Sequence, residues 1–184
     1  AVHEAGAFFY CDGANFNAIV GRVRPGDLGI DCMHLNLHKT FSTPHGGGGP
    51  GSGPVALSQA LAPFAPLPAV VADGDGFRLV EHAGDAPDDT ASIGRMKGFH
   101  GQFATFVRAL AYMLSHGGDG LKQVSSDAVL NANYLMARLG DVLNAPFDGP
   151  CMHEALFDDH SLDGTGVTTL DLAKALVDEG YHPT

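Results

Sequence analysis

Short apolar runs and longer connections alternate along the first part of the chain. Residues 7–11 form an apolar run that ends at Asp12, and residues 32–37 alternate apolar and polar side chains just before Lys39. Both patterns are typical of strands with at least one buried face. The connection between them exceeds a dozen residues, the length that a parallel crossover requires. The pattern therefore predicts an α/β fold.

Farther along the chain the pattern favours helices, with two further strand regions. A short helix is expected over residues 55–61, a hairpin over 70–80 around Asp73–Gly76, an acidic surface loop over 81–89 and a strand over 151–157. Helical spacing of apolar residues predicts helices over 102–115, 119–140 and 169–177. His116-Gly117-Gly118 is expected to end the first helix, and Thr168 or Thr169 to cap the last, with Gly180 as its stop.

A segment rich in glycine and proline, residues 42–54, interrupts this pattern. Its sequence is STPHGGGGPGSGP. Such a composition is typical of a flexible linker between domains. It is equally typical of an ordered loop whose backbone closely approaches a ligand or another chain. Composition alone leaves both alternatives open.

Charge and cysteine content exclude several classes of protein. The 184 residues include 10 Lys+Arg and 21 Asp+Glu, a formal net charge of −11, which disfavours a broad nucleic-acid or anionic-membrane surface. No apolar run reaches the roughly 20 residues of a membrane span. Cys11, Cys32 and Cys151 are odd in number and widely spaced, so we expect free thiols in a reducing compartment.

The candidate chemistry centres on Lys39, which follows a predicted strand directly. Ligands of open α/β sheets bind at the carboxyl ends of strands, and a partly desolvated lysine there can attach an aldehyde cofactor. Asp12 closes the other predicted strand and could pair with the ring nitrogen of pyridoxal phosphate; Ala14 is small enough to lie under the ring. A surface lysine at a strand end remains the alternative.

A metal site around the nearby histidines is not expected. His34 and His38 are four residues apart, the spacing of a ligand pair on a helix, but the pattern here predicts a strand. No HExxH motif follows, and the glycine run is not followed by the Gly-Lys-Ser/Thr of a phosphate-binding loop. His38, beside Lys39, is better suited to contact a phosphate or carboxylate.

Several motifs together resemble the glycine cleavage system P-protein, a family of fold-type-I pyridoxal-phosphate enzymes. The most specific are HLNLHKTF at residues 34–41 and HGGGGPG at 45–51. Similar blocks are DGAN at 12–15, SIGRMKGFHG at 92–101 and NANYL at 131–135. The resemblance extends over essentially the whole chain.

The resemblance implies roles for individual residues. Lys39 would hold pyridoxal phosphate covalently, Asp12 would pair with its ring nitrogen, and Ala14 would pack on the ring. His38 would lie near the phosphate. The glycine-rich loop would line the mouth through which the lipoyl arm of a partner H-protein enters, which disfavours the linker interpretation.

The resemblance also implies a fold and a reaction. The fold would be part of an aspartate aminotransferase-like large domain, residues 1–145, followed by the beginning of a small α/β C-terminal domain, residues 146–184. Glycine would lose CO2, and its aminomethyl group would pass to the lipoyl group. Family members work as dimers of catalytic units.

Family members are also longer, so we expect a fragment that lacks the ring-stacking residue and most phosphate ligands. It would be located in the cytoplasm of a bacterium or the mitochondrial matrix of a eukaryote. The alternatives are a non-catalytic piece that acts only within a complex, and another fold-type-I pyridoxal-phosphate enzyme.

Overall fold

The computed structural model describes residues 1–86 and 90–182, and it divides into two compact units. The first unit is Ala1–Gln123 and the second is Val124–Thr184. Sheets lie in the first unit, while helix α2, Phe103–Leu139, contributes residues to both. The expected domain boundary at residues 145/146 concerns the domains of a longer protein and stays a prediction.

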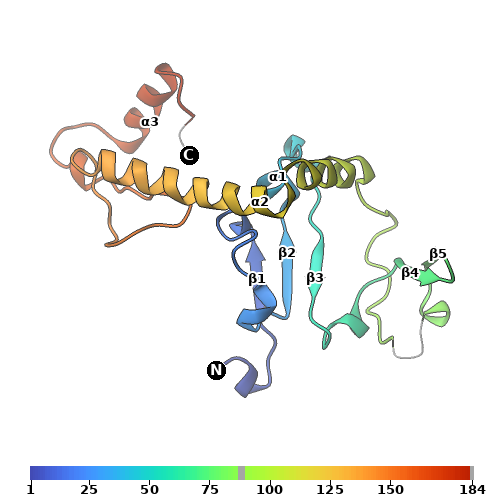
Figure 1. Ribbon diagram of the computed structural model, residues 1–184. Coiled ribbons are helices and arrows are strands. Elements are labelled where there is room, and N and C mark those ends of the chain that lie inside the picture. Colours follow the sequence, from blue (N-terminus) through green and yellow to red (C-terminus); the bar gives the residue numbers. More distant parts are fainter. Residues whose placement is uncertain (87–89, 183–184) are drawn as a thin grey trace. The chain divides into compact units, whose positions relative to one another are not determined.

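The central element of the first unit is a three-stranded sheet of order β1-β2-β3 (Figure 1). Strands β1, Tyr10–Gly13, and β2, Cys32–Leu35, are parallel, with Asp12 opposite His34. The long connection between them contains only 3-10 turns. The α/β pattern with an early parallel pair is therefore confirmed, although β1 begins later than the apolar run that predicts it.

Strand β3, Val55–Leu57, corrects the expected helix at residues 55–61. It pairs with β2 in the antiparallel direction, with Val55 opposite His34. A short apolar run has no decisive periodicity, so its local pattern suits either state. Hydrogen bonding to the free edge of β2 decides the outcome here, and that edge is visible only in the tertiary structure.

A separate two-stranded hairpin confirms the prediction for residues 70–80. Strands β4, Ala69–Asp73, and β5, Gly76–Val80, are antiparallel and turn at Asp73–Gly76. The expected acidic loop follows as irregular structure and a 3-10 turn at Ala83–Asp85, and its residues 87–89 lie outside the described residues.

The structure confirms the expected break in the helix at residues 116–118. Helix α2, Phe103–Leu139, consists of two helical segments joined at a kink, in agreement with the two helices that the sequence predicts. Gly117 is the non-helical residue, with φ 63° and ψ −178°. Glycine reaches this conformation without a Cβ clash, so the backbone changes direction at one residue and then resumes helical geometry.

The buried core of the first unit lies between α2, the β1–β2 connection and the short helix α1, Leu37–Thr40. It consists of Val20, Leu37, Phe41 and Ala109, with Phe16, Tyr112, Met113 and Leu121 packed against it. This cluster attaches α1 to α2 through apolar contacts, and burial of such side chains stabilises a fold by about 1.5–3 kcal/mol each. The orientation of α1 therefore depends on α2.

The second unit contains the end of α2 and helix α3, Thr169–Asp178. The expected strand at 151–157 is wrong: the described structure there is irregular. The Asn133 side chain instead bonds the Cys151 backbone, donating to its carbonyl oxygen at 2.7 Å and accepting from its N–H at 3.0 Å. One amide thus satisfies the backbone groups that a neighbouring strand would have bonded.

Helix α3 and its expected cap are confirmed. Thr168 forms a reciprocal capping box with Asp171, and Gly180 follows the helix with φ 85°. Within the described residues, no helix is both long enough and apolar enough to cross a membrane.

Candidate functional site

The candidate site lies at the carboxyl end of the parallel strands β1 and β2. Figure 1 shows both strands pointing toward the end of the sheet where α1 begins. Asp12 is on β1, and Lys39 is on α1, directly after β2. The crevice outside the carboxyl ends of parallel strands is where open α/β sheets bind their ligands. The topology therefore brings both predicted residues to one end of the sheet.

Packing of α1 determines which way Lys39 faces. Leu37, Thr40 and Phe41 are each at most 6% exposed, and they occupy the spacing of one helical face. Lys39 lies between them in sequence and is exposed. No carboxylate among the described residues forms an ion pair with it. The amine is therefore available to an external group.

Asp12 belongs to a polar cluster on one face of the sheet. Its Oδ1 accepts a 2.9 Å hydrogen bond from the N–H of Ala14 and lies 3.3 Å from Nε2 of His34. The same His34 nitrogen is 3.2 Å from Oδ1 of Asn36, and the Tyr10 hydroxyl bonds His34 Nδ1. The carboxylate is held on its Oδ1 side, and none of the described residues bonds Oδ2.

Gly13 permits the close approach of strands β1 and β2 at this point. A Cβ on Gly13 would lie 1.7 Å from the carbonyl oxygen of His34. Any side chain here would push the two strands apart, and Asp12, the preceding residue, would move with β1. Glycine at this position is therefore a condition for the contact between Asp12 and His34.

His38 differs from Lys39 because it is half-buried. The ring packs edge-on against His45, with centroids 4.6 Å apart, and its Nδ1 is buried without a partner. Burial, with the nearby His45 and Lys39, lowers the pKa of His38 below its ordinary value. A neutral imidazole can donate one hydrogen bond to a phosphate but brings no charge.

The glycine-rich loop is ordered and belongs wholly to the first unit. The Gln102 side chain donates to the carbonyl of Gly49 at 2.9 Å, and the Thr105 hydroxyl donates to that of Pro50 at 3.0 Å. At Gly46, φ is 53° and a Cβ would lie 2.5 Å from Pro50 Cγ. The linker interpretation is therefore wrong, and the loop is attached to the beginning of α2.

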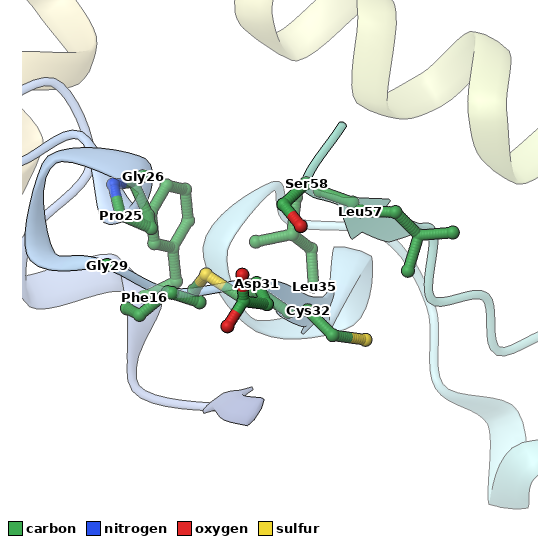
Figure 2. Close-up of a pocket in the computed structure, with 12 residues that line it drawn as sticks. Phe16, Pro25, Gly26, Gly29, Asp31, Cys32, Leu35, Leu57 and Ser58 are labelled. Atoms are coloured by element: carbon green, nitrogen blue, oxygen red, sulfur yellow. The ribbon is translucent and has the colours of Figure 1, made fainter. Parts of the chain in front are cut away.

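A pocket of about 420 Å³ lies on the first unit, and the polar cluster around Asp12 does not line it (Figure 2). Phe16, Met33, Leu35 and Leu57 give it apolar walls. Its Asp31 carboxylate accepts from the Phe9 N–H at 2.8 Å and lies 2.7 Å from His3 Nε2, and the Phe9 bond is the main cause of its lowered pKa. Asp31 thus anchors the segment before β1, and neither Asp12 nor Lys39 lines the pocket.

Sequence reasoning missed Tyr10 and the role of His34. The sequence patterns suggest only one role for His34, that of a metal ligand. The described residues contain no group of three or more His, Cys, Asp or Glu side chains that could hold a metal. The alternation of side chains along the two strands could have predicted the polar cluster of Tyr10, Asp12 and His34. Tyr10 and Asp12 lie on one face of β1, and Cys32 and His34 lie on one face of β2.

The residues present fit pyridoxal phosphate. An exposed, unpaired amine suits covalent attachment, and a carboxylate with one free oxygen suits a protonated ring nitrogen. Buried and unpartnered polar atoms on the same segment, Thr40 Oγ1, Thr43 Oγ1 and His38 Nδ1, are groups that phosphate oxygens can satisfy.

Comparison with known proteins identifies relatives along nearly the whole chain. A family model described as "Glycine dehydrogenase, C-terminal domain" matches residues 124–184. The "Probable glycine dehydrogenase (decarboxylating) subunit 2" of Caulobacter vibrioides is 71% identical over 182 residues, covering 98% of this chain and 34% of that protein. The protein of the same name from Oceanobacillus iheyensis is 53% identical, covering 99% and 36%.

A solved structure shares the fold. The crystal structure of glycine decarboxylase (P-protein) of the glycine cleavage system, in inhibitor-bound form, has a TM-score of 0.73 and 23% identity, covering 99% of this chain and 41% of that chain. Over nearly its whole length the chain is therefore similar to the proteins named glycine dehydrogenase (decarboxylating) subunit 2, and it spans about a third of the length of the curated relatives it matches.

Proposed function

We propose that this chain is part of a pyridoxal-phosphate enzyme that decarboxylates glycine and transfers the remaining aminomethyl group to the lipoyl arm of an H-protein. One observation carries the proposal. Asp12, near the carboxyl end of β1, and Lys39, just after the parallel strand β2, lie at one end of the sheet, in a chain 71% identical to a protein named probable glycine dehydrogenase (decarboxylating) subunit 2.

Four residues of this chain would hold the cofactor. Lys39 would attach it covalently through Nζ, and Asp12 would face its ring nitrogen with the unbonded Oδ2. Ala14 is half-buried and small, so it leaves room for a flat ring beside Asp12. His38 would offer a single neutral N–H to the phosphate. When bound, pyridoxal phosphate supplies an electron sink for the electron pair left by the departing CO2.

The chain's own contribution is positioning and proton control. The Asp12 carboxylate would keep a proton on the facing nitrogen through charge pairing. Lys39, on the exposed side of a helix whose other side is buried, would hold its amine in one place while remaining free to accept or release a proton. The ordered glycine-rich loop would shape the entrance used by the lipoyl arm.

We propose the finer fold and the assembly on the same grounds. Residues 1–145 would belong to a fold-type-I large domain and residues 146–184 to the start of the small domain, supported by the parallel pair β1–β2 and the shared fold. The remaining polypeptide of the longer relatives would complete the site, and a dimer of catalytic units is expected. The location in cytoplasm or mitochondrial matrix stays a prediction.

The decisive experiment locates the cofactor on the chain. The full-length protein that carries these residues is loaded with pyridoxal phosphate, reduced with borohydride and digested, and the modified peptide is identified by mass spectrometry. We expect the label on Lys39 and its loss in Lys39→Ala. The matched control is Lys174→Ala, which removes an exposed lysine of α3 and is expected to change nothing.

Exchange of carbon between glycine and bicarbonate then tests the substrate. Glycine-dependent exchange that Lys39→Ala abolishes supports the proposal. Label on a different lysine would refute the assigned site. Exchange with another amino acid in place of glycine would favour a different fold-type-I enzyme, and absence of both label and exchange would favour a non-catalytic piece.

A further inference from the structure

The Asp12 carboxylate is exposed, yet it has a defined environment. Its side chain is 69% exposed, and a solvated carboxylate of this kind ordinarily samples several rotamers. Here Oδ1 contacts two nitrogens, the backbone N–H of Ala14 at 2.9 Å and Nε2 of His34 at 3.3 Å. Both contacts fall on the same oxygen, so they favour one orientation in which Oδ2 is left unbonded.

The neighbours of His34 specify its tautomer. Nε2 forms a 3.2 Å hydrogen bond with Oδ1 of Asn36 and lies 3.3 Å from Oδ1 of Asp12, so both neighbouring oxygens favour a proton on Nε2. Nδ1 is then the acceptor, and the Tyr10 hydroxyl is its donor. Tyr10 keeps that proton at neutral pH, because partial desolvation and the Asp12 charge raise its pKa.

The ring of His34 is itself restrained. Its side chain is only 24% exposed, and the Tyr10 and His34 rings are nearly parallel, with an interplanar angle of 18° and centroids 6.0 Å apart. Residues 10, 12 and 34 come from two hydrogen-bonded strands, so the sheet register keeps them together. The restrained imidazole can therefore limit the rotation of the Asp12 carboxylate.

We propose that His34 is a positioning residue for Asp12: its Nε2–H edge, oriented by the Tyr10 hydroxyl, holds Oδ1 and directs Oδ2 toward the cofactor. The inference rests on the proposed function, in which Oδ2 faces the ring nitrogen of pyridoxal phosphate. His34 touches neither substrate nor cofactor in this scheme. It acts through Asp12, as outer-shell partners orient ligands at metal sites.

Two measurements on the full-length protein test this role. In the cofactor-free protein, imidazole ¹⁵N chemical shifts are expected to show the proton of His34 on Nε2, and Tyr10→Phe is expected to shift Nδ1. In the loaded protein, the ¹⁵N shift of labelled pyridoxal phosphate reports whether its ring nitrogen is protonated. We expect protonation in the wild type and its loss in Asp12→Asn.

The critical variant is His34→Phe, which keeps a flat ring of similar size but removes both nitrogens. We expect partial loss of the ring-nitrogen proton and about tenfold weaker cofactor retention, the size of one lost contact to a charged group. His34→Gln keeps an N–H donor and is expected to restore much of both. His160→Phe, which breaks a His–Asp contact in the second unit, is the matched control and should change neither.

The outcomes separate this inference from the proposed function. Cofactor bound on Lys39 with an unchanged ring-nitrogen shift in His34→Phe would overturn the positioning role alone. A proton on Nδ1 of His34 in the cofactor-free protein would also overturn it. Failure of pyridoxal phosphate to attach to Lys39 would overturn the proposed function, while the tautomer measurement would still decide whether His34 holds Asp12.

Discussion

The role of a single side chain in this protein depends on where the backbone places it. Asp12 and Asp31 have similar partners: each contacts a backbone N–H and a histidine nitrogen through one carboxylate oxygen. Their positions differ, because Asp31 precedes β2, whereas Asp12 lies near the carboxyl end of β1, the end at which Lys39 follows β2. The position along the strands, rather than the residue type, makes Asp12 the better candidate for chemistry.

A pH-dependent cap is expected at the beginning of α3. Asp171 accepts bonds from the Thr168 hydroxyl at 2.7 Å and the Thr168 N–H at 3.0 Å, and these lower the pKa of Asp171 below its ordinary value. Because the folded-state pKa lies below that of the unfolded chain, the stabilisation is present above the unfolded value and is lost as pH falls through the folded one. The first turn should therefore loosen in acid.

Amide-exchange protection factors of residues 171 and 172, measured as a function of pH, check this expectation. Protection should fall below about pH 4, near the ordinary carboxyl pKa. Asp171→Asn should remove this dependence, and Thr168→Ala should cost about 1 kcal/mol of helix stability. Asp178→Asn, at the other end of α3, is the control; the same change in both aspartate variants would contradict the capping mechanism.

Elements of the fold depend on the backbone conformation of single residues. The kink of α2 is located at Gly117, while the adjacent Gly118 has ordinary helical geometry and open space around its Cα. Gly117 adopts a conformation that other residues avoid, so glycine is favoured there. Gly118 is helical, so glycine there costs conformational entropy and offers no compensating advantage.

Alanine substitutions at the two positions should therefore have opposite signs. Gly117→Ala forces a Cβ into a positive-φ conformation with ψ near 180°, so we expect a loss of about 1–3 kcal/mol in the free energy of unfolding. Gly118→Ala should gain about 0.5–1 kcal/mol, because alanine is the better helix former. Urea unfolding measures both changes, and equal effects at the two sites would contradict the kink.

At the scale of the whole molecule, two large exposed side chains, Tyr10 and Val55, lie beside the polar cluster on one face of the sheet. Tyr10 and Val55 flank β2 on the face that carries His34, and they are 54% and 55% exposed. Burial of such surface from water is favourable in any association that permits it. The isolated chain is therefore expected to self-associate and to bind hydrophobic dyes.

Val55→Lys should reduce this association, because it replaces an exposed apolar side chain on this face of the sheet with a charge. The measurement is sedimentation of the isolated chain at several concentrations, with dye fluorescence in parallel. Gln59→Lys adds the same charge at an exposed polar position and should have little effect. Equal behaviour of the two variants would mean that net charge, rather than the sheet face, controls association.

Prediction from sequence succeeded where a residue pattern has one physical solution. The alternating hairpin around Asp73–Gly76 and the capped helix α3 were both found, because turn and cap residues act locally. The assignments at 55–61 and 151–157 failed. In the first case the edge of β2 selected a strand, and in the second the Asn133 side chain replaced one, and neither partner is close in sequence.

By itself, the sequence determined the resemblance to the glycine cleavage P-protein family, the α/β character and the placement of Asp12 and Lys39 at the carboxyl ends of two successive strands. These follow from motifs and local periodicity, which need only neighbours along the chain. The tertiary structure decided which side of α1 presents Lys39, the order of the glycine-rich loop and the contact of His34 with Asp12. Each of these depends on packing or register between distant segments, and the energies that select them arise only when the segments meet.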